Sequence, residues 1–297
     1  MKDRIQWVDC AKGIAVILVV LGHCVRAANS DTELVARAII FSFHMPLFFL
    51  LSGLTTGYSK SVPEYFRKLL HSAYRLLVPA VLLYITITLI DFARTGTTDY
   101  REYFLMRLRI LYYASGVKVK CPGGYVPALG MLWFLFSLFA AKALSDALRL
   151  VLRNETAIAA AVLVLTVSGV AVSRIKWLPW SFDVTLASLG FFWLGKRIKQ
   201  LPFDRQLQRN TLIAFAVWAV TLAVSLLTKG TYLELAARKY PFFPLCFVTA
   251  AAGSLFVMLC SMILVSYKKA AEPLIWLGRH SMTLYCVHSM DYLLSSL

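Results

Sequence analysis

Charged residues are scarce in this chain of 297 residues. Only 15% of its residues are Asp, Glu, Lys or Arg, whereas 59% are hydrophobic. Soluble domains carry roughly 25% charged and 45–50% apolar residues. No linker, charge block or low-complexity stretch separates off a soluble domain. These absences predict one membrane domain over residues 1–297, in which the apolar excess faces lipid.

Several chemical signatures are also missing. The six cysteines form no CxxC pair and lie mostly in apolar segments, which favours small buried side chains over metal or disulfide roles. No two histidines stand at i and i+4 with a carboxylate, so a zinc site is the weaker alternative and no metal is expected. Neither a GxSxG nucleophile elbow nor a GxxxxGK[ST] phosphate loop occurs.

Long apolar runs, by contrast, recur along the whole chain. A bilayer core requires about 20 mostly apolar residues per helix. The runs predict an all-α, polytopic bundle of about nine to ten membrane helices. A basic, amphipathic stretch at 99–120 is either an interfacial helix or a tenth span. The nine clear segments are 6–27, 36–57, 72–93, 127–149, 156–173, 181–198, 210–228, 242–266 and 273–295.

The basic residues outnumber the acidic ones, and the net charge is +16. Lys and Arg lie mostly between the apolar runs, where they meet lipid headgroups, so membrane lipids and not nucleic acids are the expected partners. The short loops on one side carry more of them. This bias predicts a cytoplasmic N-terminus, and the oligomeric state is left open.

Polar residues inside the first apolar helix form a stripe. At 100° per residue, Lys12 lies about 300° and His23 about 320° on from Asp9, so the three fall within a face about 60° wide. Lys12 and His23 are roughly 16 Å apart along the axis. Charged and strongly polar side chains are costly in a bilayer and mark function. The plainer interpretation is an interfacial ion pair of Asp9 with Lys12 and a buried, hydrogen-bonded His23.

Two further helices contain histidine. His44 stands just before Pro46, whose ring is expected to kink the helix, and Ser52 follows on the same segment. In the last helix Tyr285 and His288 belong to one polar stripe. The histidines of the three helices either line one water-accessible cavity or serve as hydrogen-bonded packing residues.

Six segments together resemble the family-3 membrane acyltransferases. The similarity is greatest to the branch of fucose 4-O-acetylase-like proteins, with polysaccharide O-acetyltransferases as relatives. The segments are DCAKGIAVILVVLGH (9–23), FHMPLFFLLSG (43–53), YRLLVPA (74–80), GMLWFLFSLF (130–139), LPWSFDVTLASLGFFWLGK (178–196) and WLGRHSMTLYCVH (276–288).

The resemblance implies a membrane enzyme of the bacterial plasma (inner) membrane. It implies transfer of an acyl group, usually acetyl, from cytoplasmic acyl-CoA to a hydroxyl of a cell-envelope sugar, glycan or lipid-linked precursor. The histidine that closes the first helix is held essential in the family, and His23 stands there. Lys12 occupies a position where arginine is commoner. Of the family's basic pair in the third helix, Arg75 matches the second member and Ser72 replaces the first.

The candidate site follows from these residues. His23 is expected to act as general base or as transient acyl carrier, because the pKa of histidine suits either role at neutral pH. The remaining catalytic candidates are Lys12, Asp9 and His44. The phosphates of the donor, acetyl-CoA or another acyl-CoA, require basic groups on the cytoplasmic side. The candidates there are Arg67, Lys68, Arg75 and Arg279, and those for the acceptor are Trp133, Ser52, Tyr285 and His288.

A membrane transporter of a small polar or glycan-related substrate is the alternative function. Intramembrane polar residues and a proline-broken helix also suit substrate passage. The two halves of the sequence show no internal repeat, which favours the enzyme.

Overall fold

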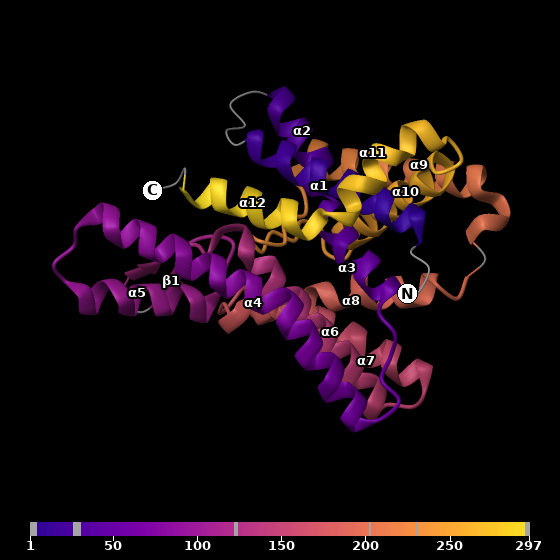
Figure 1. Cartoon of the computed structure of the whole chain (residues 1–297). Coiled ribbons are helices and arrows are strands. Elements are labelled where there is room, and N and C mark those ends of the chain that lie inside the picture. The colour runs from indigo at the N-terminus through magenta and orange to yellow at the C-terminus, as the bar shows by residue number, and fades with distance from the viewer. Residues whose placement is uncertain (1–4, 26–30, 122–123, 202, 230, 295–297) are drawn as a thin grey trace. The chain divides into compact units, whose positions relative to one another are not determined.

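A computed structural model of the chain describes residues 5–25, 31–121, 124–201, 203–229 and 231–294. The described residues are predominantly helical (Figure 1), which confirms the all-α fold. Strands β1 and β2 pair as an antiparallel hairpin. The elements are α1 (Gln6–Cys24), α2 (Asp31–Phe41), α3 (His44–Thr55), α4 (Val62–Thr95), α5 (Tyr100–Tyr113), β1 (Val119–Cys121), β2 (Gly124–Val126), η1 (Gly130–Leu132), α6 (Trp133–Val151), α7 (Glu155–Ser173), η2 (Pro179–Ser181), α8 (Phe182–Ile198), η3 (Phe203–Gln206), α9 (Leu207–Lys229), α10 (Leu245–Leu264), α11 (Lys268–Arg279) and α12 (Ser281–Leu294).

Seven helices of the described residues are long and apolar enough to cross a membrane. They correspond to seven of the nine expected segments, with α2 and α3 together forming one of them. The segment at 181–198 forms α8, a shorter helix of 17 residues. The segment at 273–295 is divided at His280, whose φ of −100° and ψ of 12° end α11 before α12 begins. The chain is therefore a multi-pass membrane protein.

The helix expected at 36–57 is broken at Ser42 and Phe43, between α2 and α3. The ring of Pro46 would clash with the carbonyl group four residues earlier, at Ser42, in a continuous helix. Neighbouring helices bind the groups at the break. Trp218 Nε1 donates to Ser42 Oγ (3.1 Å), and Ser254 Oγ donates to the carbonyl oxygen of Phe43 (3.3 Å). These hydrogen bonds hold the break in a defined geometry. Helix α3 begins directly after it, at His44.

Helix α4 begins ten residues before its expected start at 72. The sequence signal for this start is local. Ser61 caps the helix by accepting a hydrogen bond from the amide of Glu64, and Pro63 lies in the first turn. The carboxylate of Glu64 in turn accepts the amide of Lys60 (2.9 Å). These capping hydrogen bonds start the helix in a polar stretch. A prediction from apolar runs alone does not include that stretch.

The basic stretch at 99–120 does not form a tenth span. Helix α5 has 14 residues, roughly 21 Å at 1.5 Å per residue, whereas the hydrocarbon core is about 30 Å thick. It packs on the C-terminal half of α4. There, Tyr103 Oη donates to Asp91 Oδ2 (2.7 Å), Arg107 pairs with Asp91, and Tyr84 Oη donates to the carbonyl oxygen of Arg107 (2.9 Å).

The chain divides into two compact units. The first contains the residues up to Thr55 together with Phe191–Leu235 and Lys239–Tyr285. The second contains Thr56–Gly190, Ala236–Arg238 and the residues from Cys286 onward. Each unit combines separate stretches of the chain. The single domain expected over 1–297 stays a prediction.

In the first unit, α1 packs against α11 with their backbones almost in contact. A Cβ atom added at Gly278 would lie 1.7 Å from the carbonyl oxygen of Asp9, and one at Gly13 would lie 2.0 Å from that of Leu274. Only glycine leaves room for this approach, as is common where membrane helices pack closely. The two glycines therefore fix α11 against the N-terminal half of α1.

The second unit contains a buried ion pair. Arg238 Nε lies 2.9 Å from Asp183 Oδ2, with side-chain exposures of 2% and 0%. The guanidinium also donates to Ser115 Oγ (2.9 Å) and Ser181 Oγ (3.2 Å), and it lies 4.1 Å from the centre of the Trp177 ring. Such hydrogen bonds are what makes a buried charge pair tolerable.

The glycine contact gives a testable prediction about stability. Replacing Gly278 by Ala should lower the melting temperature of the detergent-purified protein, because the added methyl group overpacks a backbone contact that cannot yield. Overpacking of this kind typically lowers the free energy of unfolding by about 1–3 kcal/mol. Gly57→Ala is the matched control, since a Cβ atom there meets nothing within 4 Å. Equal melting temperatures for the two variants would contradict the close approach.

Candidate functional site

His23 lies in the last turn of α1 and is half-buried. The helix ends just after it, and the amide of Val25 donates to the carbonyl oxygen of Leu21 (3.1 Å). Gly22 beside it allows close packing, because a Cβ atom there would lie 2.8 Å from Cε2 of Phe41.

His44 is the first residue of α3 and is buried. Its Nδ1 lies 2.9 Å from the carbonyl oxygen of Ile40. Since a carbonyl oxygen can only accept, Nδ1 carries the proton and Nε2 holds the lone pair when the ring is neutral. The Phe41 ring connects the surroundings of the two histidines, because it packs against His44 (centroid distance 4.9 Å) and lies close to Gly22, the residue before His23. Two of the predicted catalytic residues, from different helices, therefore lie near one aromatic ring.

Arg37, Phe41 and Tyr232 surround the end of α1. Arg37 Nη1 donates to the carbonyl oxygen of Val25 (2.8 Å), and its Nε donates to Tyr232 Oη (3.1 Å). The guanidinium lies 4.8 Å from the centre of the Phe41 ring. Phe41 packs edge-on against the His44 ring, with a centroid distance of 4.9 Å. His44 and the end of α1 that carries His23 therefore meet the same group of aromatic and basic side chains.

Asp9, Lys12 and Arg279 form a separate cluster near the other end of α1. Lys12 Nζ lies 3.7 Å from Asp9 Oδ1, and Arg279 Nε lies 3.8 Å from Asp9 Oδ2. Asp9 is buried and shares its charge between two more exposed cations. Asp9 and His23 are separated by roughly 21 Å along the ideal helix axis. The structure therefore unites Arg279 with two predicted catalytic residues and places all three away from His23.

The predicted donor-binding residues of α4 lie in the second unit. Arg67 and Arg75 are exposed. Together with His71 they recur every four residues, so the three side chains share one face of the helix. Lys68 points elsewhere. Its Nζ donates to the carbonyl oxygen of Tyr58 (2.8 Å) and pairs with Glu64 (3.0 Å). The ammonium group of Lys68 is therefore engaged by Tyr58 and Glu64 in this structure.

The predicted acceptor-binding residues are divided between the two units. Trp133 is 4% exposed, and its ring packs so closely on Gly116 that an added Cβ would lie 2.5 Å from Cδ1. Ser52 is half-buried on α3. Tyr285 belongs to the first unit and His288 to the second, although both lie on α12. The acceptor role of these four residues stays a prediction.

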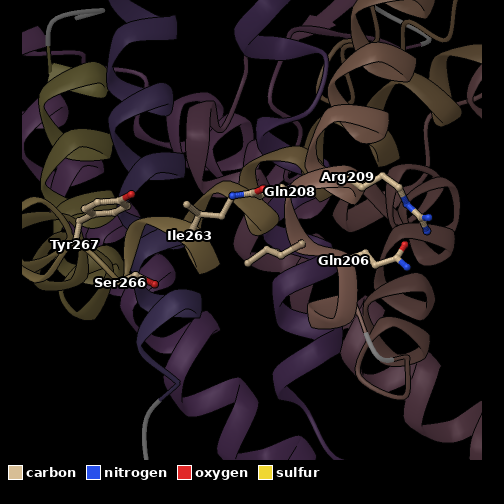
Figure 2. A pocket seen from close by; sticks show the side chains of 7 residues that line it. Gln206, Gln208, Arg209, Ile263, Ser266 and Tyr267 are labelled. Carbon is tan, nitrogen blue, oxygen red and sulfur yellow. The ribbon is translucent and has the colours of Figure 1, made fainter.

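Two hollows contain polar side chains. The larger, about 560 Å³, lies between the start of α9 and the end of α10, with Tyr267 and Ser266 on one side and Gln206 and Arg209 on the other (Figure 2). No predicted site residue lines it. A smaller hollow of about 30 Å³ in the second unit is lined in part by Lys68, and it has room for little more than water.

Sequence reasoning missed Arg37 and Tyr232. Arg37 could have been found from the sequence, because it is a cation in Thr32–Thr55, a segment apolar enough to span a membrane. A charge in such a segment marks function. Tyr232 stands in the connection between α9 and α10, outside any helix, and belongs to no periodic pattern. No group of three or more His, Cys, Asp or Glu side chains in the described part of the chain could hold a metal ion. The expectation of a metal-free site stays a prediction.

Comparison with known proteins gives two matches. A family model described as "Acyltransferase domain", that of the family-3 acyltransferases, matches residues 5–296. The chain is also 24% identical over 309 residues to the nodulation protein NolL of Sinorhizobium fredii (strain NBRC 101917 / NGR234), an alignment that covers 97% of this chain and 78% of that protein. No solved structure matches the chain.

Proposed function

This chain belongs to the family-3 membrane acyltransferases, and from that premise we propose that it moves an acyl group, in the first instance acetyl, from acyl-CoA to a sugar hydroxyl. Family membership implies an acyl donor and an acceptor. The proposed donor is cytoplasmic acetyl-CoA or another acyl-CoA. The proposed acceptor is a cell-envelope sugar, glycan or lipid-linked precursor. The proposed location is the bacterial inner membrane, with the N-terminus in the cytoplasm.

The observation that best supports this proposal is the position of the Phe41 ring, which packs against His44 and against Gly22, the residue before His23. A hydroxyl group is a poor nucleophile at neutral pH and needs a base, and imidazole has the appropriate pKa. His23 is half-buried at a helix end, whereas His44 is buried and its Nδ1 is committed to the carbonyl oxygen of Ile40. This arrangement favours His23 as the reacting base and His44 as the residue that orients the acceptor.

The reaction then proceeds in two steps. His23 takes the proton of the acceptor hydroxyl as its oxygen attacks the thioester carbon, and a tetrahedral intermediate forms. The intermediate collapses by breaking the carbon–sulfur bond, and the leaving CoA thiolate takes the proton from the imidazolium. The products are an acyl ester of the sugar and free CoA. In the alternative route, the imidazole itself attacks the thioester and carries the acyl group transiently.

Binding of the donor is proposed to use the basic groups at the cytoplasmic surface. CoA carries phosphates, for which exposed arginines are the preferred partners. Arg67 and Arg75 share an exposed face of α4. Around Asp9, the two positive charges of Lys12 and Arg279 exceed the single negative charge of the carboxylate. We therefore assign Lys12, Asp9 and Arg279 to donor binding and not to proton transfer, because they lie far from His23 along α1.

Replacement of His23 by Ala tests the catalytic assignment. Transfer from acetyl-CoA should fall by about 10²- to 10⁴-fold, the usual contribution of a positioned base, while the melting temperature in detergent stays close to that of the parent. His280→Ala is the control, since His280 is exposed and outside the histidine cluster. Near-normal transfer by the His23 variant would refute the assignment.

The same preparation separates the two routes. Incubation with radiolabelled acetyl-CoA in the absence of acceptor, followed by rapid denaturation at neutral pH, which preserves an acyl-imidazole better than acid does, should leave the protein unlabelled if His23 is a base. Label that is retained by the parent protein and lost in His23→Ala would establish the acyl carrier instead.

Substitution of the arginines of α4 tests the donor site. Arg67→Gln combined with Arg75→Gln should raise the KM for acetyl-CoA by about 10-fold or more, because charge-assisted hydrogen bonds to phosphate are lost. The KM for acetylpantetheine, which lacks the nucleotide phosphates, should not change. Arg94→Gln, at the opposite end of the same helix, is the control. An unchanged KM for acetyl-CoA in the double variant would exclude this face of α4.

A further inference from the structure

Arg37 is a cation within Thr32–Thr55, a segment apolar enough to cross a membrane. A charge in such a segment is unfavourable unless it is bound by other groups, and it marks function. The acyl transfer proposed above assigns it no role. Its contacts with Val25, Phe41 and Tyr232, however, lead to the surroundings of the two histidines.

The first contact is with the end of α1. Arg37 Nη1 donates to the carbonyl oxygen of Val25 (2.8 Å), two residues beyond His23. The last carbonyl groups of a helix have no partner within it, and a cation there interacts favourably with the helix dipole. Arg37 therefore ties down the turn of α1 on which the His23 side chain stands.

The other contacts lead to His44. The guanidinium lies 4.8 Å from the centre of the Phe41 ring, and that ring packs edge-on against His44. Nε donates to the hydroxyl of Tyr232 (3.1 Å), which is buried and packs against the same Phe41 ring at 6.0 Å. The planar guanidinium thus spans three groups at once, which a lysine ammonium cannot do in the same geometry.

We propose that Arg37 is a positioning residue for the acyl transfer: it holds His23 in place beside His44, with the Tyr232 hydroxyl as its second anchor. The proposal rests on the catalytic role proposed for His23. Arg37 acts through the end of α1 and does not touch the reacting atoms. Its loss should mainly slow the chemical step, since a base displaced by about 1 Å can lose about 10² in rate.

Steady-state kinetics of the purified full chain test this proposal. Arg37→Gln should lower kcat by about 10- to 100-fold and leave the KM for acetyl-CoA unchanged. Arg37→Lys should restore little of the loss. Tyr232→Phe keeps the ring packing and removes one hydrogen bond, so kcat should fall by about 2- to 10-fold; this milder variant keeps the test valid if Arg37→Gln does not fold. Arg174→Gln, an exposed arginine of the second unit, is the control.

The decisive arm combines Arg37→Gln with His23→Ala. Because Arg37 acts through His23, its substitution should not reduce further the residual rate of the His23 variant. An equal further loss in that background would overturn the proposal, as would parental kcat in both Arg37→Gln and Tyr232→Phe. A raised KM for acetyl-CoA with unchanged kcat would overturn it too. Near-normal transfer by His23→Ala alone would instead refute the proposed function, so the two failures are distinguishable.

Discussion

The close packing of α1 against its neighbours is the constraint on which the first unit depends. Gly13 and Gly278 leave the backbones of α1 and α11 in contact, and Gly22 admits the Phe41 ring next to His23. Lipid provides no hydrophobic drive for helices to associate, so close van der Waals contact and polar bonds must hold them together. Two of these contacts lie beside polar groups that the proposed chemistry uses: Gly278 lies against the backbone of Asp9, and Gly22 precedes His23.

Along α1 the polar groups separate into two sets with different chemistry. The cluster of Asp9, Lys12 and Arg279 has a net positive charge and suits an anion, while the cluster around His23 and His44 suits proton transfer. Acyl-CoA is an extended molecule with phosphates at one end and the thioester at the other. A donor with its phosphates at the membrane surface and its thioester inside the bilayer would need such a separation, and a single compact site would not provide it.

The sequence was sufficient for the features that depend on local pattern. Apolar runs predicted the seven helices of the described residues that could cross a membrane, together with two segments that are not among them, and Pro46 predicted a disturbed helix near His44. The role of His23, which the family motifs indicate, stays a prediction. The sequence did not predict the features that depend on partners far apart along the chain. Arg37 meets Tyr232, and Asp183 meets Arg238, across long stretches of chain that no periodicity connects. The early start of α4 follows from the capping pattern at Ser61 and Glu64, which lies in a polar stretch before the apolar run.

The central claim is that this chain transfers an acyl group from acyl-CoA to an envelope sugar, and the chemical composition of the envelope tests it most directly. Envelope glycans and lipid-linked sugars from cells with the gene, without it, and with the gene restored should be compared by mass spectrometry. We predict that one species loses the mass of a single acyl group, such as acetyl, when the gene is deleted and regains it on restoration. Identical glycan and lipid-linked sugar masses in all three strains would contradict the account.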